Sequence, residues 1–411
     1  MRLCVDLFIR IKTSNQQINE SSNQQQMEST NMNILITGAK GFIGKNLIAQ
    51  LNNIKEGKAK EERIPSDLTV FAYDVDSDPE SLDEYCQKAD FVFHLAGVNR
   101  PKKQSEFMEG NFGFTSVLLD TLRKYGNTCA VMLASSIQAE LDNPYGVSKK
   151  AGEELLFRYA EETGAKVYVY RFPNVFGKWC RPNYNSVVAT FCYNIARDLP
   201  IQVNDPNVMM TLVYIDDLVD ELISALAGNP TREGKYCKVP IEYKITLGEI
   251  VELIYSFRES RRNLQVPDMG NAFIKKLYAT YLSYLPKNDF YYPLKMNVDP
   301  RGSFTEFLKS PDRGQVSVNI SKPGITKGNH WHHTKNEKFL VVYGKGVIRF
   351  RKIDEEKVYE YYVSGDKLEV VDIPVGYTHN IENLGDADMV TIMWANEVFD
   401  VEKPDTFFLK V

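Results

Sequence analysis

The stretch that decides the fold of the first half of the chain is residues 33–44, NILITGAKGFIG. Its first five residues form a short apolar run, which is typical of a buried parallel strand. Gly38, Gly41 and Gly44 follow in a G-x-x-G-x-x-G pattern, directly before the helix-like residues 45–51. Glycines there let the backbone turn sharply and approach a pyrophosphate at the N-terminus of the helix. The stretch therefore predicts a dinucleotide-binding turn, although a tight strand-to-helix turn without a ligand has the same pattern.

Working outward from this turn, strand-like and helix-like segments alternate along the chain. Further strands are expected at residues 70–75, 91–95, 130–134 and 167–172, and helices at residues 112–125 and 148–162. Such alternation is typical of an α/β fold with a doubly wound parallel sheet. After about residue 288, closely spaced strand-like runs separated by glycine-containing turns predict a small all-β barrel or sandwich instead.

Composition and charge exclude several classes of protein. The 411 residues carry a formal net charge of −5, which gives no basic field for nucleic acid or anionic lipid. No apolar run approaches the roughly 18 to 20 residues that cross a bilayer. The six cysteines occur without C-x-x-C pairs, which favours reduced thiols. We therefore expect a cytoplasmic protein that binds neither nucleic acid nor membranes.

Further residues for a dinucleotide lie at the ends of the next two expected strands. Asp74 can accept hydrogen bonds from the ribose hydroxyls and would repel a 2′-phosphate, or it is an ordinary turn aspartate. His94 and Ala96 lie at the carboxyl edge of the sheet, where ligands bind, although His94 is equally compatible with a structural role. Lys40, in the glycine-rich turn, is the alternative partner for a 2′-phosphate.

A tyrosine and a lysine then follow at helical spacing. Tyr145 and Lys149 form Y-x-x-x-K, which places the phenol and the ammonium one turn apart on one helix face. A nearby cation lowers the pKa of a tyrosine, so the phenol can exchange a proton with a carbonyl or hydroxyl oxygen. Ser135 and Ser136 end the preceding strand and can hold that oxygen. By itself, the pair also fits an amphipathic helix with no catalytic role.

With GAKGFIG, HLAG, the two serines, Y-x-x-x-K and RFPNVFG at residues 171–177, residues 32 to about 240 resemble the extended short-chain dehydrogenase/reductase family. The resemblance implies a Rossmann domain and a Ser-Tyr-Lys catalytic set, in which Ser136 matches the serine and Ser135 stays an alternative. It also implies a nucleotide-sugar substrate and NADPH as cofactor, with NADH possible because Asp74 stands where NADPH users tend to have a basic residue. We expect Asn174, Arg181 and Asn183 to contact the nucleotide sugar, and Lys149 to contact the cofactor as well.

Four side chains with metal-binding chemistry lie near the end of the sequence: His330, His332, Glu337 and His379. The first two, at i and i+2 on a strand, point to the same side. Glu337 and His379 would join them from neighbouring strands and complete a site for one divalent ion. Zinc fits this ligand set best, with iron, manganese and nickel as alternatives. Isolated core or surface histidines are the other interpretation, and His333 is not expected to be a ligand.

The spacings G-x5-H-x-H-x4-E-x6-G and P-x-G-x2-H-x3-N resemble the cupin superfamily, over about residues 290–411, although Leu368 replaces an expected glycine. Residues 299–307, DPRGSFTEF, resemble a segment of the dTDP-sugar 3,5-epimerases. That resemblance implies that Arg301 and Glu306 help to hold a sugar nucleotide. A β-turn at Arg-Gly is the plainer alternative.

The order of the two domains, with residues 178–198, 328–342 and 372–385, resembles a family of bifunctional capsular-polysaccharide enzymes. The resemblance implies epimerisation at carbon 3 of a UDP-2-acetamido-2,6-dideoxy-4-hexulose by the cupin and reduction at carbon 4 by the other domain. A UDP-N-acetyl-6-deoxytalosamine would result. One alternative is a nucleotide-sugar 4-epimerase or dehydratase with a cupin that only dimerises. The other is a non-enzymatic nucleotide sensor, which would have no need of Tyr145 and Lys149.

The expected organisation follows from these assignments. Residues 1–31 form a disordered leader, because a Gln/Asn/Ser-rich segment buries too little apolar surface to fold. Residues 32–245 form an NAD(P)-binding reductase domain with its substrate elements, residues 246–289 a helical connector and residues 290–411 a cupin domain. We expect the chain to act as a homodimer.

Overall fold

The computed structural model describes residues 31–411, so the leader predicted for residues 1–31 lies almost wholly outside the described residues. The described chain divides into two compact units. One contains the residues up to Val175 together with Thr211–Glu242, and the other contains Phe176–Met210 together with Tyr243–Val411.

The first unit is built on a seven-stranded sheet in the order β2-β1-β3-β4-β5-β9-β8. Its strands are β1 (Met32–Thr37), β2 (Leu68–Tyr73), β3 (Phe91–His94), β4 (Ala130–Ser136), β5 (Val167–Phe172), β8 (Arg232–Glu233) and β9 (Tyr236–Cys237). All the neighbours are parallel except β8 and β9. The strand order reverses between β1 and β3, and ligands of such sheets bind outside the carboxyl ends of the strands at this point.

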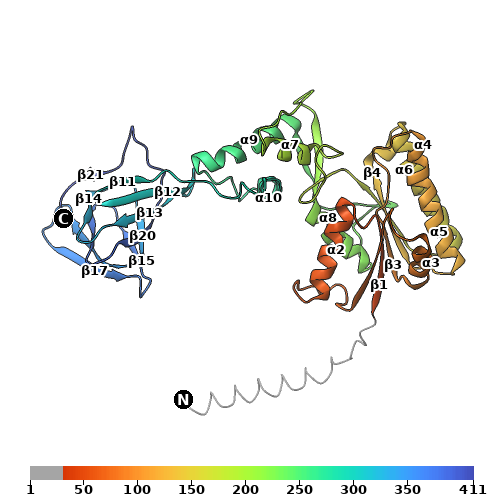
Figure 1. Ribbon diagram of the computed structural model, residues 1–411, viewed down its shortest axis with the longest axis horizontal. Coiled ribbons are helices and arrows are strands. Elements are labelled where there is room, and N and C mark those ends of the chain that lie inside the picture. Colours follow the sequence, from red (N-terminus) through yellow and green to blue (C-terminus); the bar gives the residue numbers. More distant parts are fainter. Residues whose placement is uncertain (1–30) are drawn as a thin grey trace, which may run out of the picture. The chain divides into compact units, whose positions relative to one another are not determined.

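Helices cover both faces of this sheet, as Figure 1 shows. The helices are α2 (Phe42–Lys55), α3 (Pro79–Lys88), α4 (Ser105–Met108), the π-helix η1 (Glu109–Gly113), α5 (Phe114–Lys124), the 3₁₀ helix η2 (Ile137–Glu140), α6 (Pro144–Thr163) and α8 (Ile215–Leu226). Successive residues of a strand face opposite sides. Accordingly Ile34 and Ile36 pack with the core of α2 and α8, while Leu35 packs with that of α3, α5 and α6. The Rossmann-like fold predicted from the sequence is confirmed.

The helical part of the second unit brings together two separate stretches of sequence. It contains α7 (Val187–Ile195), α9 (Leu247–Asn263) and α10 (Ala272–Leu282), and the chain passes between the units in β6 (Asn174–Phe176) and β7 (Met209–Tyr214). These two strands and β10 (Tyr243–Thr246) form a three-stranded sheet. The Tyr284 hydroxyl donates to the carbonyl oxygen of Cys180 at 2.6 Å, which ties the segment before α7 to the end of α10. Residues 176–210 therefore group with residues 243–289, whereas the sequence-based division placed them with the reductase.

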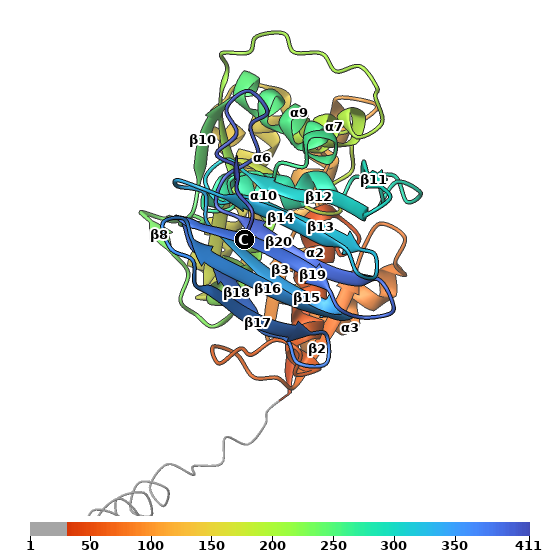
Figure 2. The same cartoon turned by 90° about the vertical axis from the view of Figure 1, so that its left-hand side faces the viewer.

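Two antiparallel sheets make up the rest of the second unit, and Figure 2 faces their strands. One contains β11 (Asn297–Asp299), β12 (Gly302–Ser310), β13 (Gly314–Ser321), β20 (Met389–Ala395), β15 (Glu337–Tyr343) and β18 (Val370–Ile373). The other contains β17 (Val358–Ser364), β16 (Lys345–Lys352), β19 (Tyr377–Asn383), β14 (Thr326–Trp331) and β21 (Phe407–Phe408). Phe339 and Ile373 from the first sheet share a buried core with Phe350 and Ile381 from the second. The predicted C-terminal all-β domain is thereby confirmed, and these two sheets, from β11 to β21, are called the β-domain below.

Within residues 31–411, no helix is both long enough and apolar enough to span a membrane.

Candidate cofactor and metal sites

The glycine-rich turn lies at the sheet edge where the strand order reverses. Gly38 has a φ of 69°, and a Cβ there would lie 2.7 Å from the backbone nitrogen of Ala96. A Cβ on Gly44 would lie 2.4 Å from the carbonyl oxygen of Gly38, so neither position accepts a side chain. The N-cap residue of α2 is Gly41, which has no side chain to cap the helix, and the first turn of α2 contains no acidic residue. The positive end of the helix thus suits a pyrophosphate, as the sequence predicts.

Asp74 lies beside this turn and also stabilises it. Its carboxylate accepts hydrogen bonds from the backbone amides of Lys40, at 2.7 Å, and Val75, at 2.8 Å. The Lys40 ammonium pairs with the carboxylate of Asp76 at 2.5 Å, and both side chains are exposed. Two carboxylates, of Asp74 and Asp76, and the Lys40 ammonium thus lie together at the end of β2, where an adenosine ribose is expected.

His94 has a structural role in the core of the first unit. Its ring is 1% exposed, and its two nitrogens bond the hydroxyls of Thr37, at 2.7 Å, and Thr115, at 2.9 Å. Burial, with a smaller contribution from the charge of Lys149, lowers the pKa of His94 to about 3. The ring is therefore neutral and links β1 and β3 to α5. This arrangement favours the structural alternative over direct contact with a cofactor.

Tyr145 and Lys149 occupy successive turns of α6, which begins four residues earlier than expected. Asn143 caps this helix by accepting from the backbone amide of Gly146, and Pro144 occupies the first turn. The Lys149 ammonium donates to the carbonyl oxygen of Ala134 at 3.1 Å and lies 5.9 Å from the centroid of the Tyr145 ring. Burial lowers the pKa of Lys149 to about 8, although the charge of Glu153 acts in the opposite direction.

The pKa of the Tyr145 phenol moves in the direction opposite to the sequence-based expectation. Burial raises this pKa, and a hydrogen bond with Ser136 offsets only part of the increase. The Lys149 ammonium donates to the backbone carbonyl of Ala134, and burial, not this cation, sets the direction of the shift. A surface cavity of about 530 Å³ borders this turn of α6 and includes Pro144 and Val147 in its lining.

The two serines at the end of β4 have different surroundings. The Ser136 side chain accepts a hydrogen bond from the Gln138 amide at 3.2 Å and lies near enough to Tyr145 to lower the pKa of its phenol. The Ser135 hydroxyl instead donates to the buried carboxylate of Glu153 at 2.5 Å, and the guanidinium of Arg171 donates to the same carboxylate at 2.6 Å. Ser135 is thus held in an internal polar network, and the geometry favours Ser136 as the serine that meets a substrate oxygen.

Asn111 is a residue of this site that the sequence reasoning missed. It lies in the π-helix η1, an element that is frequent at functional sites. Its amide donates to the carbonyl oxygen of Val98 at 3.0 Å and to the Ser148 hydroxyl at 2.9 Å. A Cβ on Gly97 would lie 2.8 Å from the Asn111 side-chain oxygen and 2.9 Å from the Lys149 nitrogen. Asn111 belongs to no linear motif, so nothing in the sequence pointed to it.

Of the residues expected to bind substrate, Glu306 is half-buried and the other four are exposed. Asn174 lies on β6, while Arg181 and Asn183 precede α7, with the Arg181 guanidinium 5.1 Å from the Tyr184 ring centroid. Arg301 pairs with Asp299 at 2.6 Å across the turn between β11 and β12. Glu306 pairs with Lys309 at 2.8 Å. Their roles in substrate binding remain predictions.

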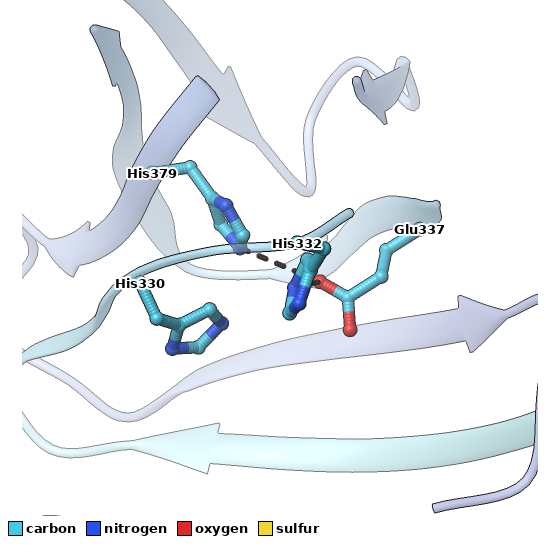
Figure 3. Close-up of side chains that lie close together, drawn as sticks. All are labelled: His330, His332, Glu337 and His379. Carbon is cyan, nitrogen blue, oxygen red and sulfur yellow. Dashed lines mark ion pairs between the residues drawn. The ribbon is translucent and has the colours of Figure 1, made fainter. Parts of the chain in front are cut away.

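The four predicted metal ligands converge in the β-domain (Figure 3). His330 lies on β14, His332 follows that strand, Glu337 begins β15 and His379 lies on β19. One ligand atom from each residue lies within 4.8 Å of the others. A Glu337 carboxylate oxygen lies 3.4 Å from the Nε2 atoms of both His332 and His379. These three atoms are buried, and none has a hydrogen-bond partner among the described residues. Because buried polar atoms are normally satisfied, this arrangement fits a divalent cation.

The protonation of the cluster also suits a metal. Burial lowers the pKa of His330 to about 3, helped by the neighbouring His379 and His332 rings, so that His330 is neutral. Burial alone would raise the pKa of Glu337, but its polar neighbours, the Lys335 ammonium among them, outweigh burial and hold that pKa below its usual value. A neutral imidazole and an ionised carboxylate are the forms that bind metal. His333 is exposed and makes an edge-to-face contact with the Trp331 ring, and it is not a member of the cluster.

Two family models match separate parts of the chain. Residues 34–236 match the NAD dependent epimerase/dehydratase family, and residues 297–407 match the polysaccharide biosynthesis C-terminal domain. Together these matches contain the glycine-rich turn, Tyr145 and Lys149, and all four residues of the His/Glu cluster.

Two of the proteins that this chain resembles match it over 92% of its length. UDP-2-acetamido-2,6-β-L-arabino-hexul-4-ose reductase of Pseudomonas aeruginosa is 46% identical over 380 residues, which cover 92% of this chain and 99% of the relative. The crystal structure of the capsular polysaccharide assembling protein CapF of Staphylococcus aureus matches with a TM-score of 0.85 and 62% identity, over 92% of this chain and 100% of that one. UDP-glucuronate 4-epimerase 1 of Arabidopsis thaliana is 24% identical, over 68% of this chain and 77% of its own length. The chain therefore belongs to the family of the UDP-2-acetamido-2,6-β-L-arabino-hexul-4-ose reductase and CapF.

Proposed function

We propose that the chain is a bifunctional UDP-sugar enzyme of capsule or O-antigen synthesis. The β-domain, a cupin barrel, epimerises carbon 3 of a UDP-2-acetamido-2,6-dideoxy-4-hexulose with the help of a divalent metal. The first unit then reduces the carbon 4 ketone with NAD(P)H to give a UDP-N-acetyl-6-deoxytalosamine. The observation that carries this proposal is the presence of a Ser-Tyr-Lys constellation and a four-residue His/Glu cluster in one chain. The reductase name of the Pseudomonas relative, which is shared over almost its whole length, supports it.

In the reduction, the cofactor supplies the hydride, and residues of the chain hold and protonate the carbon 4 oxygen. Tyr145 donates a proton to the carbon 4 oxygen, and Ser136 holds that oxygen beside the phenol. The Tyr145 phenol is protonated at neutral pH, as a proton donor must be, and the burial that raises its pKa makes the proton harder to release. Lys149, fixed by the Ala134 carbonyl, holds a positive charge near the phenol as the proton leaves.

For the cofactor, we propose that Gly38, Gly41 and Gly44 receive the pyrophosphate and that Ala96 borders it. Asp74 and Lys40 are the proposed partners of the adenosine ribose, with Lys40 available to a 2′-phosphate of NADPH. His94 supports this edge of the sheet from within the core.

In the epimerisation, a proton next to the ketone is removed and returned on the other face. A divalent metal supplies positive charge that offsets the negative charge developing on the ketone oxygen. His330, His332, Glu337 and His379 are the proposed ligands, and zinc is the ion that suits three imidazoles and a carboxylate best. We propose Arg301 and Glu306 as contacts of the sugar nucleotide in this domain, and Asn174, Arg181 and Asn183 as contacts for the reduction.

Product analysis tests this function. The full-length chain is incubated with the UDP-linked 4-keto sugar, with and without NADPH or NADH, and the products are identified by NMR. The proposal requires inversion at carbon 3 and a reduced carbon 4 with one equivalent of cofactor consumed. A product inverted only at carbon 4, with no net consumption of cofactor, would instead support a 4-epimerase with a structural β-domain. Mass measurement in solution tests the proposed homodimer.

A further inference from the structure

Residues 405–411 contact the strands of the His/Glu cluster from outside it. Strand β21 pairs with β14 at His330. The Thr378 hydroxyl, adjacent to the cluster residue His379, donates to the carbonyl oxygen of Leu409. This short segment therefore adjoins both strands that carry histidines of the cluster.

Asp405 fixes the loop that joins two cluster residues. Its carboxylate accepts hydrogen bonds from three consecutive backbone amides, those of His333, Thr334 and Lys335, at 2.9, 2.7 and 2.9 Å. Partial burial would raise the pKa of Asp405, but these amides outweigh burial and hold the pKa well below its usual value. The loop lies between His332 and Glu337, so its conformation sets how the two side chains face one another.

The backbone of the same residue orients a histidine ring. The Nδ1 atom of His332 lies 2.5 Å from the carbonyl oxygen of Asp405. A carbonyl oxygen only accepts hydrogen bonds, so Nδ1 carries the proton and donates it. The lone pair of His332 is then on Nε2, which faces Glu337 at 3.4 Å.

We propose that Asp405 is a positioning residue for metal binding, which sets the tautomer of His332 through its carbonyl and the His332–Glu337 loop through its carboxylate. The inference rests on the metal site proposed above. Outer partners of metal ligands typically contribute 10- to 100-fold to metal affinity, because they fix the orientation of the ligands before the metal binds.

Zinc affinity of the full-length protein tests the proposal. Metal-free wild type, Asp405→Ala and Asp386→Ala are each titrated with Zn²⁺ in competition with a chromophoric chelator. Asp386 is an exposed aspartate between β19 and β20 and serves as the matched control. We expect about 10- to 100-fold weaker binding for Asp405→Ala and unchanged binding for Asp386→Ala. Asp405→Asn, which keeps one acceptor oxygen, should fall between wild type and Asp405→Ala.

Thermal unfolding with and without Zn²⁺ separates positioning from simple stabilisation. If Asp405 positions the ligands, a fixed free concentration of Zn²⁺ should raise the Tm of Asp405→Ala by less than it raises the Tm of wild type. An equal fall in Tm with and without Zn²⁺, at unchanged affinity, would overturn the inference and leave a purely structural role. If wild type itself does not bind Zn²⁺, the proposed metal site fails. If wild type binds and Asp405→Ala binds equally well, only the role of Asp405 fails.

Discussion

The proposed reductase site and the His/Glu cluster differ in whether their buried polar groups have hydrogen-bond partners within the protein. In the first unit, His94 uses both ring nitrogens and Lys149 donates to a backbone carbonyl, so these buried groups have partners within the protein. In the β-domain, buried atoms of His332, Glu337 and His379 face one another without a hydrogen-bond partner among the described residues. The first site is thus completed by partners within the chain itself, whereas the second would be completed by the cation proposed for it.

The largest expected effect is that of removing the acid of the first site. Tyr145→Phe deletes only the phenol oxygen, so we expect NAD(P)H consumption to fall by about 10² to 10⁴. Because Ser136 still accepts from the Gln138 amide and Lys149 still donates to the Ala134 carbonyl, far-UV circular dichroism and Tm should change little. Tyr125→Phe, at the end of α5, is the matched control and should keep full activity. A Tyr145→Phe enzyme with wild-type turnover would remove Tyr145 from the mechanism.

The His/Glu cluster should respond by losing its metal. His332→Ala removes one of four proposed ligands, and we expect Zn²⁺ affinity to fall by more than the roughly 100-fold that an outer partner contributes. His333→Ala, one residue further along the chain but outside the cluster, should bind as wild type does. Metal analysis of both purified variants measures this difference. Equal zinc content in the two variants would show that the cluster does not hold the ion.

Lowering the pH should reduce the free energy of unfolding of the first unit, because its buried His94 ring is neutral when folded. The pKa of His94 is about 3 in the folded protein, compared with 6.5 for a free histidine. Between these values the unfolded chain binds the proton and the folded one does not, so the free energy of unfolding falls as the pH decreases from 6.5 towards 3. One such group contributes at most about 1.4 kcal/mol per pH unit. Denaturant unfolding of wild type and His94→Gln at pH 4.5 to 7.5 measures this contribution to the free energy of unfolding. An identical pH dependence in the two proteins would show that His94 does not contribute to it.

The smallest effect concerns the choice of cofactor. Asp74 and Asp76 at the end of β2 oppose a 2′-phosphate, while Lys40 favours one and is paired with Asp76. We therefore expect kcat/KM for NADPH and NADH to differ by less than about tenfold, or 1.4 kcal/mol. Lys40→Ala should weaken NADPH more than NADH. A hundredfold preference for NADPH in wild type that survives Lys40→Ala would mean that another group binds the phosphate.

The sequence predicts most of the features that depend on residues close together in the chain. The G-x-x-G-x-x-G turn and the Y-x-x-x-K helix are contiguous motifs whose geometry follows from the helix and strand periods, and the His/Glu spacing indicated a shared site. Residues that act through tertiary contacts were not predictable in this way. Asn111 and Asp405 each fix a site through bonds to distant backbone, and no spacing in the sequence relates Asp405 to His332. The direction of the Tyr145 pKa was not predictable from the sequence either, because it is set by burial of the phenol, which is a tertiary property.

Proton exchange at carbon 3 tests the central claim, that two separable sites divide the two reactions, most directly. In deuterated water without reduced cofactor, the 4-keto sugar is incubated with wild type, Tyr145→Phe or His332→Ala, and label at carbon 3 is followed by NMR. We predict that wild type and Tyr145→Phe introduce deuterium at similar rates and that His332→Ala introduces none. Loss of exchange in Tyr145→Phe, or full exchange in His332→Ala, would contradict the division of labour between the two sites.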